Sequence, residues 1–333
     1  MSWRAACLVA GLTCLTLAPT SGRADSAAPP LVLERRISLA GVAGRIDHMA
    51  YDARRGRLLV AELANGSLDV IDIAAARGLH RITHLTEPQG VAYAPVADAI
   101  LVACGDGTVR FFRADDFTPL GTIALGDDAD DVALTADGSR VVVGFGEGGL
   151  AVIDPVQRAV TATVRLPAHP EAFRIDARTD RAFVNVPGAR EVAVVDLASA
   201  RHIARWKYAG LDANFPMALD DTRGVLAVVF RSPPRLVMLD AATGDVIARQ
   251  PTCQDADDVF FDPARHRLYV SCGDGHIDVA RWDGSALRPL ARIATAPGAR
   301  TSLFVPGRDR LFVAARASWS LSDAAILIFR PSP

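Results

Sequence analysis

One short hydrophobic pattern occurs seven times in this chain at nearly constant spacing, and it constrains the fold more than any other feature. The copies begin at residues 48, 90, 131, 172, 216, 258 and 301, so successive copies start 41 to 44 residues apart. Each copy is followed by a turn, a hydrophobic strand such as residues 58–61, a loop and a strand that often ends in Asp, such as residues 70–72. A fourth, weaker strand completes each unit. Repeated units of four strands in about 40–45 residues are typical of β-propeller blades.

Seven such units fill residues 25–333 and predict an all-β, seven-bladed β-propeller with four-stranded blades. The seventh unit ends at residues 326–329 without a fourth strand, whereas an unassigned strand at residues 31–37 precedes the first unit. We expect this N-terminal strand to complete the last blade and close the ring, because closure protects the sheet edges. A two-sheet sandwich is the alternative all-β fold, but it gives no reason for seven evenly spaced copies.

The first 24 residues have the pattern of a signal peptide. Arg4 precedes an apolar stretch at residues 5–18, and small residues lead to a cleavage motif that ends at Ala24. The stretch is too short to span a bilayer, and no later segment is apolar enough to do so. We expect a single propeller domain at residues 25–333, monomeric and periplasmic or secreted. A lipoprotein anchor at Cys14 is the alternative, although Thr13 fits that motif poorly.

The charges and cysteines restrict the partners and the compartment. The balance of 36 basic and 38 acidic residues is nearly neutral, which argues against nucleic acid as a partner. Cys104, Cys253 and Cys272 follow the signal peptide. An oxidising compartment allows a disulfide between Cys253 and Cys272, which fall near one rim of the same unit. Buried free thiols are the expectation for this pair, with the disulfide as the alternative.

Segments such as residues 58–72 and 267–279 resemble the YVTN or YncE-like family of exported bacterial propellers. The resemblance covers essentially the whole chain after residue 24, and the units lack the repeated Gly-His and Trp-Asp marks of WD40 blades. It implies the seven-bladed fold and, for some members, DNA binding, which the acidic residues described next oppose. More remote relatives include a metal-dependent streptogramin lyase and the copper domain of nitrous oxide reductase. Neither activity has a motif that can be carried over to this chain.

The residues that open each repeat differ between units, whereas the Asp residues after the first and third strands recur because they bond their own turns. The first strand of a propeller blade lines the central channel, so the variable segments should meet at one channel mouth, where closed folds bind ligands. The predicted ligand-binding residues are Asp47, His48, Gln89, Asp130, Asp131, His169, Glu171, Asn214, Asp257, Asp258 and Arg300.

Units 1 and 4 are nearly opposite in a seven-fold ring, so we expect His48 and His169 to face each other. Units 3 and 6 are also nearly opposite, which predicts the same for their Asp-Ala-Asp-Asp segments. His276 is expected on the same rim, and the remaining histidines are expected on the outer surface: His80, His84, His202 and His266. The long loop at residues 316–323, with residues 231–234, is expected to form one wall of the mouth or to bind a partner protein.

Carboxylates gathered at a narrow mouth repel one another unless a positive charge lies among them. A divalent metal would supply that charge, with ligands drawn from His48, Asp130, His169, Glu171 and Asp257. Arg300 is the alternative counter-charge. The simplest alternative is that these are solvated loop residues without a ligand.

These features predict an exported propeller that binds a small polar ligand or a divalent metal at the channel mouth. A metal-assisted hydrolase or lyase, with His48, His169 or a carboxylate as general base, is one alternative. A scaffold that binds another protein of the cell envelope is the other. No G-x-S-x-G or H-E-x-x-H motif is present, so no enzyme class follows from the sequence.

Overall fold

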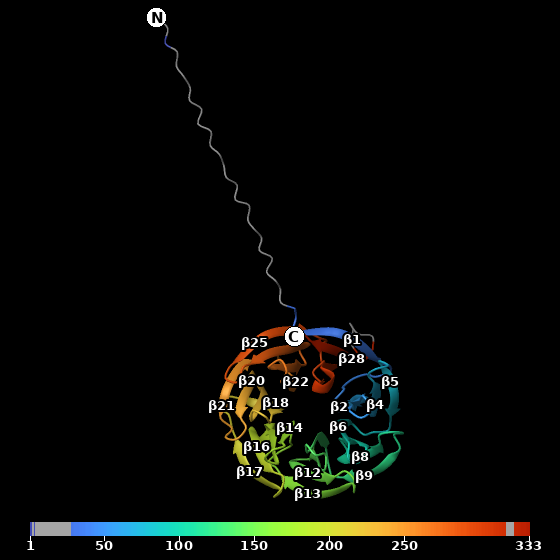
Figure 1. Ribbon diagram of the computed structural model, residues 1–333. Coiled ribbons are helices and arrows are strands. Elements are labelled where there is room, and N and C mark those ends of the chain that lie inside the picture. The colour runs from blue at the N-terminus through green and yellow to red at the C-terminus, as the bar shows by residue number, and fades with distance from the viewer. Residues whose placement is uncertain (2, 4–27, 318–322) are drawn as a thin grey trace.

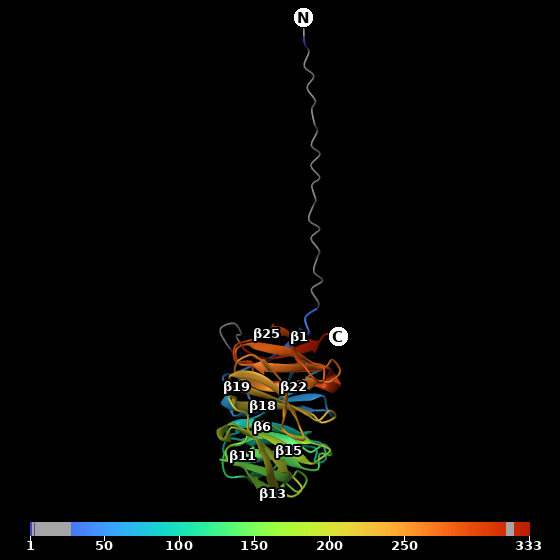
Figure 2. The ribbon, with the colours of Figure 1, turned by 90° about the vertical axis from the view of Figure 1, so that its left-hand side faces the viewer.

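Seven four-stranded antiparallel sheets are arranged as blades around a central channel (Figure 1). The structure, a computed structural model, describes residues 1, 3, 28–317 and 323–333. Figure 2 shows the ring from the side as a flattened disc. The predicted seven-bladed β-propeller is therefore confirmed. The signal peptide prediction concerns residues that, apart from Met1 and Trp3, lie outside the described part of the chain.

The strands of each blade run from the innermost to the outermost position. Blade 1 contains β2 (Met49–Asp52), β3 (Arg57–Glu62), β4 (Ser67–Asp72) and β5 (Arg77–Ile82), and blade 2 contains β6 (Pro88–Ala94), β7 (Ala99–Cys104), β8 (Thr108–Arg113) and β9 (Pro119–Ala124). Blade 3 contains β10 (Ala129–Leu134), β11 (Val141–Phe145), β12 (Gly149–Asp154) and β13 (Ala159–Arg165), and blade 4 contains β14 (Phe173–Asp176), β15 (Arg181–Val186), β16 (Glu191–Asp196) and β17 (Arg201–Trp206). Blade 5 contains β18 (Asp212–Asp220), β19 (Val225–Ser232), β20 (Pro234–Asp240) and β21 (Val246–Pro251), and blade 6 contains β22 (Ala256–Asp262), β23 (Arg267–Cys272), β24 (His276–Trp282) and β25 (Leu287–Ala294). Blade 7 contains β26 (Ser302–Val305), β27 (Arg310–Ala315), β28 (Ala324–Pro331) and β1 (Leu31–Leu39). Three short 3-10 turns are η1 (Leu63–Asn65), η2 (Pro187–Ala189) and η3 (Pro306–Arg308).

The second strand of each blade is apolar on both faces because a neighbouring blade packs against each face. In blade 1, Leu58 packs in a core cluster that contains Phe312 of blade 7, whereas Leu59 packs in a cluster that contains Tyr93 of blade 2. Successive side chains of a strand point to opposite faces, so one continuous hydrophobic run serves two blade interfaces. The outermost strands are solvated, as in β5, whose first four residues are exposed.

The N-terminal strand closes the ring, as predicted. Strand β1 pairs antiparallel with β28, from Leu31 opposite Pro331 to Leu39 opposite Ala324. Beyond the strand, the Ser332 amide donates to the Pro30 carbonyl at 3.0 Å, and the C-terminus lies beside β1 (Figure 1). Blade 7 therefore combines segments from both ends of the chain.

The recurring Asp residues stabilise turns, as predicted. One oxygen of Asp52 accepts the amide N–H groups of Arg54 and Arg55 at 3.0 and 3.1 Å. Asp240 does the same for Ala242 and Thr243 at 2.8 and 2.9 Å. Asp52 ends a first strand and Asp240 ends a third strand, so both hold turns at the same end of their antiparallel blades, and the repeated Asp residues are part of the fold.

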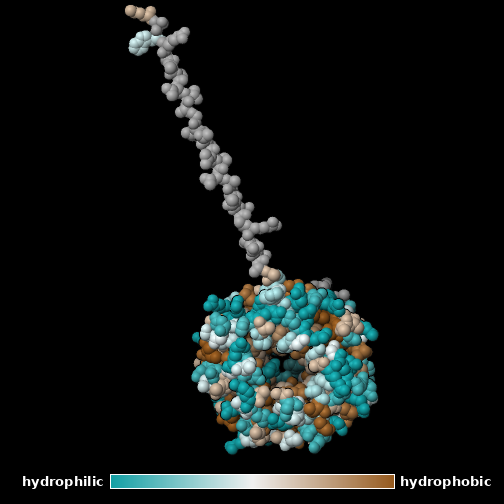
Figure 3. Space-filling view, in the orientation of Figure 1, coloured by the Kyte–Doolittle hydropathy of each residue, from teal (hydrophilic) through white to brown (hydrophobic). Residues whose placement is uncertain are grey.

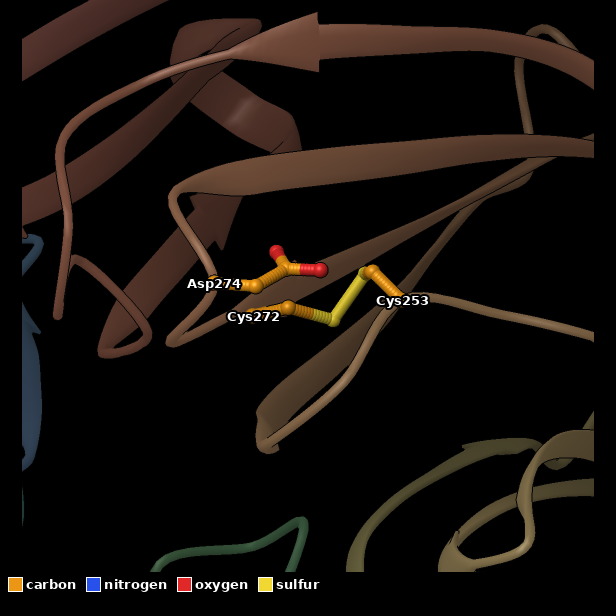
Figure 4. Close-up of side chains that lie close together, drawn as sticks. All are labelled: Cys253, Cys272 and Asp274. Carbon is orange, nitrogen blue, oxygen red and sulfur yellow. A yellow bond between two sulfur atoms is a disulfide. The ribbon is translucent and has the colours of Figure 1, made fainter.

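Cys253 and Cys272 form a disulfide, and the expectation of buried free thiols is wrong for this pair (Figure 4). Cys253 precedes β22 and Cys272 ends β23, and their Cα atoms are 5.9 Å apart, a separation that a disulfide spans. Cys104 remains a buried free thiol. Among the described residues, no helix is long and apolar enough to cross a membrane.

Candidate functional site

The seven segments that precede the innermost strands lie at one end of the channel, the channel mouth. In blade 1 the Asp47 amide donates to the Ala61 carbonyl at 2.8 Å, and in blade 4 the Glu171 amide donates to the Asn185 carbonyl at 2.9 Å. Each segment therefore lies beside the end of the second strand of its blade. Figure 3 shows an opening at the centre of the ring, bordered by hydrophilic residues.

Bulges occur in the innermost strands where these strands reach the mouth. The register of the strand pair shifts between Pro88 and Val91 in β6, between Ala129 and Val132 in β10, and between Ala256 and Asp258 in β22. Strand β18 has an equivalent shift between residues 214 and 217. A bulge re-aims side chains and is over-represented beside functional sites. The backbone of four blades is thus irregular at this one level.

Asp130 lies between the two histidines that were expected to face each other. His48 Nε2 is 3.5 Å from Asp130 Oδ1, and His169 Nε2 is 3.9 Å from Asp130 Oδ2. His169 Nδ1 lies 2.7 Å from the Gly146 carbonyl oxygen, so this nitrogen carries a proton and donates it. Side chains from blades 1, 3 and 4 therefore meet across the channel.

These contacts change the pKa of all three groups. The contact with Asp130 raises the pKa of His169 to about 9 and outweighs burial, which would lower it. Burial opposes the charge on His48, but the nearby carboxylates led by Asp130 outweigh burial and raise its pKa well above the usual range. Burial would raise the pKa of Asp130, but the two histidines lower it below its usual range. These shifts favour a carboxylate between two imidazolium ions at neutral pH.

A second cluster joins blades 5, 6 and 7 on the same rim. Arg231 Nη2 contacts Asp257 Oδ1 at 2.5 Å and Arg300 Nε contacts Asp257 Oδ2 at 3.1 Å, while Arg300 Nη1 contacts Asp255 Oδ1 at 2.7 Å. The guanidinium carbon of Arg231 lies 3.7 Å from the centre of the Phe215 ring, a cation–π contact. The side chains of Arg231 and Arg300 are each only 18% exposed. Arg300 therefore acts as a counter-charge, as the sequence suggested.

Two more carboxylates border the mouth. Asp47 is buried and lies 2.9 Å from Arg45, and burial raises its pKa. Burial, then the charge of Asp130, raises the pKa of Glu171 to about 7. The charges of Asp130 and Asp257 both act on Glu171 and on Arg45. The two Asp-rich segments of blades 3 and 6 thus border the same space.

Four of the predicted ligand-binding residues instead connect neighbouring blades. Asp131 Oδ2 accepts the Phe173 amide at 3.1 Å, and Asp258 Oδ2 accepts the Ser302 amide at 2.7 Å. Each bond links one blade to the first strand of the next, and burial raises the pKa of Asp258 to about 8. The other two residues bond groups of an adjacent blade through their amides: Gln89 bonds Asp128 at 2.8 Å, and Asn214 bonds Asn185 at 2.8 Å and the Glu191 carbonyl at 2.9 Å.

The ends of the second strands bring two arginines to the mouth, Arg231 and Arg316, which begin the two segments expected to form one wall of it. Arg231 lies near the end of β19, and Arg316 directly follows β27. Neither was among the predicted ligand-binding residues, all of which open a repeat. Because adjacent strands are antiparallel, the end of the second strand reaches the same rim as the start of the first. The available signal was therefore an unrepeated Arg at the end of the second strand.

The protein itself supplies much of the positive charge that the carboxylates require. Among the residues that the structure describes, the one group with three ligand atoms within 4.8 Å of one another is Cys253, Cys272 and Asp274. Its sulfurs are joined in a disulfide (Figure 4) and offer no thiolate. The metal site at the mouth stays a prediction. The electrostatic argument for a metal is weaker, because Arg300, His48 and His169 already supply positive charge among the carboxylates.

The remaining predictions for this rim concern the other histidines and the long loop at residues 316–323. His276 begins β24 and lies 3.2 Å from Asp274, on the rim where it was expected. His80 and His202 lie in the outermost strands β5 and β17. Of the long loop at 316–323, residues 318–322 lie outside the described part of the chain.

No protein-family model and no curated protein sequence matches this chain, so the similarity to the YVTN or YncE-like family stays a prediction. Solved structures do match. A chain of the crystal structure of the mitotic checkpoint complex aligns with a TM-score of 0.79 and 14% identity over 96% of this chain and 97% of that chain. A chain of hydrazine synthase from Kuenenia stuttgartiensis aligns with a TM-score of 0.74 and 14% identity over 87% and 98% of the two chains. At this identity the similarity shows the propeller fold alone.

Proposed function

We propose that this protein binds a small polar ligand at the channel mouth. The observation that carries the proposal is the carboxylate of Asp130, only 14% exposed, which His48 and His169 contact from two other blades. Burying ionised groups costs desolvation free energy, so such a cluster is a poor way to stabilise a fold. Titratable groups with shifted pKa values that converge in a concave site are typical of binding and catalytic sites.

The mouth offers both donors and acceptors for a polar ligand. The imidazolium groups of His48 and His169 and the guanidinium of Arg300 donate hydrogen bonds, whereas Asp47 and Glu171 accept them. Catalysis at the same mouth is the second candidate function. It is favoured by the pKa of Glu171, which at about 7 lets this group both accept and donate a proton at neutral pH.

Export of the protein is part of this proposal. Two observations support it: the signal-peptide pattern of residues 1–24, and the disulfide between Cys253 and Cys272, since disulfides persist in oxidising compartments. Mass spectrometry of the protein recovered from the periplasm of expressing cells should find a chain that begins at Asp25. A chain that begins at Met1 in the cytoplasm would exclude export.

The ligand can be sought by mass spectrometry of small molecules released from the purified protein, combined with elemental analysis for metals. We expect the wild-type protein to release a small molecule in near-stoichiometric amount. The double variant His48→Gln, His169→Gln should lose it, whereas the control variant His266→Gln, on the opposite rim, should retain it.

Three results would count against this proposal in different ways. A molecule retained by the double variant would place the ligand elsewhere. Stoichiometric zinc, calcium or manganese that the double variant loses would replace the small molecule by a metal. Neither a molecule nor a metal in the wild-type protein would refute binding at the mouth.

A further inference from the structure

Arg45, Arg231, Arg300 and Arg316 lie at the channel mouth, and the first three have carboxylate partners. Arg45 lies 2.9 Å from Asp47, and Arg231 and Arg300 share Asp257 at 2.5 and 3.1 Å. Each of these guanidinium groups is thus compensated by an acidic side chain. Asp47 and Asp257 are equally engaged, because each already contacts at least one arginine.

Among the residues that the structure describes, Arg316 has no such partner. Within the described part of the chain, no carboxylate oxygen lies within 4.0 Å of its nitrogens, and residues 318–322 contain no Asp or Glu. Its side chain lies along the loop that carries Arg300, because its Cδ and Nε would be 3.6 and 3.7 Å from a Cβ placed on Gly298. Burial, then the charges of Arg300 and Arg45, lowers the pKa of Arg316.

Arg316 is therefore a partly buried cation whose charged form the charges of Arg300 and Arg45 disfavour. A charge removed from water costs free energy unless an opposite charge compensates it. Asp47 and Asp257, whose charges raise the pKa of Arg316, are engaged by Arg45, Arg231 and Arg300. An anion from outside the chain would supply the missing compensation, and a guanidinium can bind carboxylate or phosphate oxygens with two parallel hydrogen bonds.

We propose that the ligand of the channel mouth carries a carboxylate or phosphate group, which Arg316 binds with Arg300 and Arg45 beside it. This inference rests on the proposed function, since it gives the chemical class of the ligand at that site.

The opposite side of the mouth indicates how the ligand is oriented. Glu171 belongs to blade 4, which in a seven-bladed ring faces the gap between blades 7 and 1, where Arg316, Arg300 and Arg45 lie. A carboxylate at Glu171 repels an anion and accepts a hydrogen bond from a hydroxyl or an amine. The ligand is thus an acid whose other end is a hydrogen-bond donor.

Inorganic phosphate and succinate are suitable probes, titrated into the purified protein at constant ionic strength while the thermal midpoint is measured. We expect at least one of them to raise the midpoint in a saturable way. Arg316→Gln should weaken that binding at least tenfold, and Glu171→Gln should strengthen it because a repelling charge is removed. The control Arg249→Gln changes an exposed arginine of the outermost strand β21 and should bind as the wild type does.

Arg316→Gln should fold normally, because it removes a charge that two other arginines repel. A thermal midpoint at or above that of the wild type without added anion would confirm this. Arg316→Lys keeps the charge but lacks the planar fork, so it should bind with intermediate affinity.

The inference is overturned if neither anion raises the midpoint, or if Arg316→Gln binds both as the wild type does. A neutral molecule released from the wild-type protein, lost in the double histidine variant and retained in Arg316→Gln would also overturn it, while leaving the proposed function intact.

Discussion

Replacing Asp130 with Asn should remove the charge that keeps the channel histidines protonated. Asp130 contacts both His48 and His169, at 3.5 and 3.9 Å. These distances are long for hydrogen bonds, so the attraction between opposite charges dominates. The amide of Asn has nearly the same shape as the carboxyl group but no charge. The variant therefore tests the electrostatic effect with little change in packing.

The magnitude follows from His169. Its pKa is about 9, compared with an ordinary value of 6.5, a difference that corresponds to about 3 kcal/mol in favour of the charged form. This figure is an upper bound, because the side chain of His169 is 27% exposed and solvent screens part of the attraction. In the Asp130→Asn protein the pKa of His169 should fall toward 6.5, since the main cause of its increase is gone.

The sign of the pH dependence follows from the same values. A histidine whose pKa is raised on folding stabilises the fold fully below its unfolded pKa of 6.5, and this contribution disappears as the pH rises through 9. Asp130 has a lowered pKa, so its contribution is present above 3.8 and disappears as the pH falls. The loss of stability in the variant, relative to wild type, should thus be greater at pH 6 than at pH 10. The difference in stability between variant and wild type also includes an opposite contribution, because the variant no longer has to remove the charged carboxylate from water.

Two measurements check this reasoning. Histidine proton resonances followed by NMR as a function of pH give the pKa of His169, with His169→Gln used to assign its signal. Urea unfolding at pH 6 and pH 10 gives the free energies. Asp128→Asn is the matched control, because Asp128 is 3.7 Å from the same ring but 49% exposed, so its effect should be smaller. An unchanged pKa of His169 in the Asp130→Asn protein would refute the reasoning, as would a stability difference that is the same at both pH values.

Three further predictions concern the fold around the mouth. Replacing Cys253 and Cys272 with Ser should lower the free energy of unfolding, measured by urea unfolding, by about 3 kcal/mol in the chain-entropy model for a loop of this length. Reduction of the wild-type protein should cause an equally large loss of stability. No loss in either case would contradict the disulfide. Asp258→Asn retains an acceptor for the Ser302 amide and removes a carboxyl whose pKa is about 8; wild-type stability should therefore fall as the pH rises from about 4 to 8, and the variant should lose that part of the dependence. Deleting residues 28–39 removes β1 and exposes the edge of β28, so size-exclusion chromatography should show association; a stable monomer would argue against the importance of ring closure.

The propeller could be predicted because its signals are local and repeated. A blade needs four short strands at fixed spacing, and seven copies make the pattern visible without any knowledge of the structure. Ring closure was predictable for a similar reason, since the seventh unit lacks one strand and the N-terminus has one in excess. The turn-forming Asp residues, such as Asp52 and Asp240, were predictable because they bond the backbone of their own turns.

The roles of adjacent residues at the mouth were decided by the tertiary structure. Asp130 reaches two histidines across the channel, whereas the next residue, Asp131, bonds the neighbouring blade. A bulge in β10 lies at this point, so the alternation of strand faces cannot be counted from the sequence. The same irregularity occurs in β22, beside Asp257 and Asp258.

The sequence by itself thus determined the ring, its closure and the rim on which unrepeated polar residues collect. The sequence also placed the segments that begin with Arg231 and Arg316 at this rim, but only the tertiary structure decided the charge there. It pairs Arg231 with Asp257 and places Arg316 beside Gly298, and these contacts join residues that are not neighbours in the chain. Only the structure also decided the disulfide, since the distance between two cysteines depends on the pairing of their strands. Spacing along a chain defines a repeat, but the approach of side chains from different blades depends on how the blades are packed.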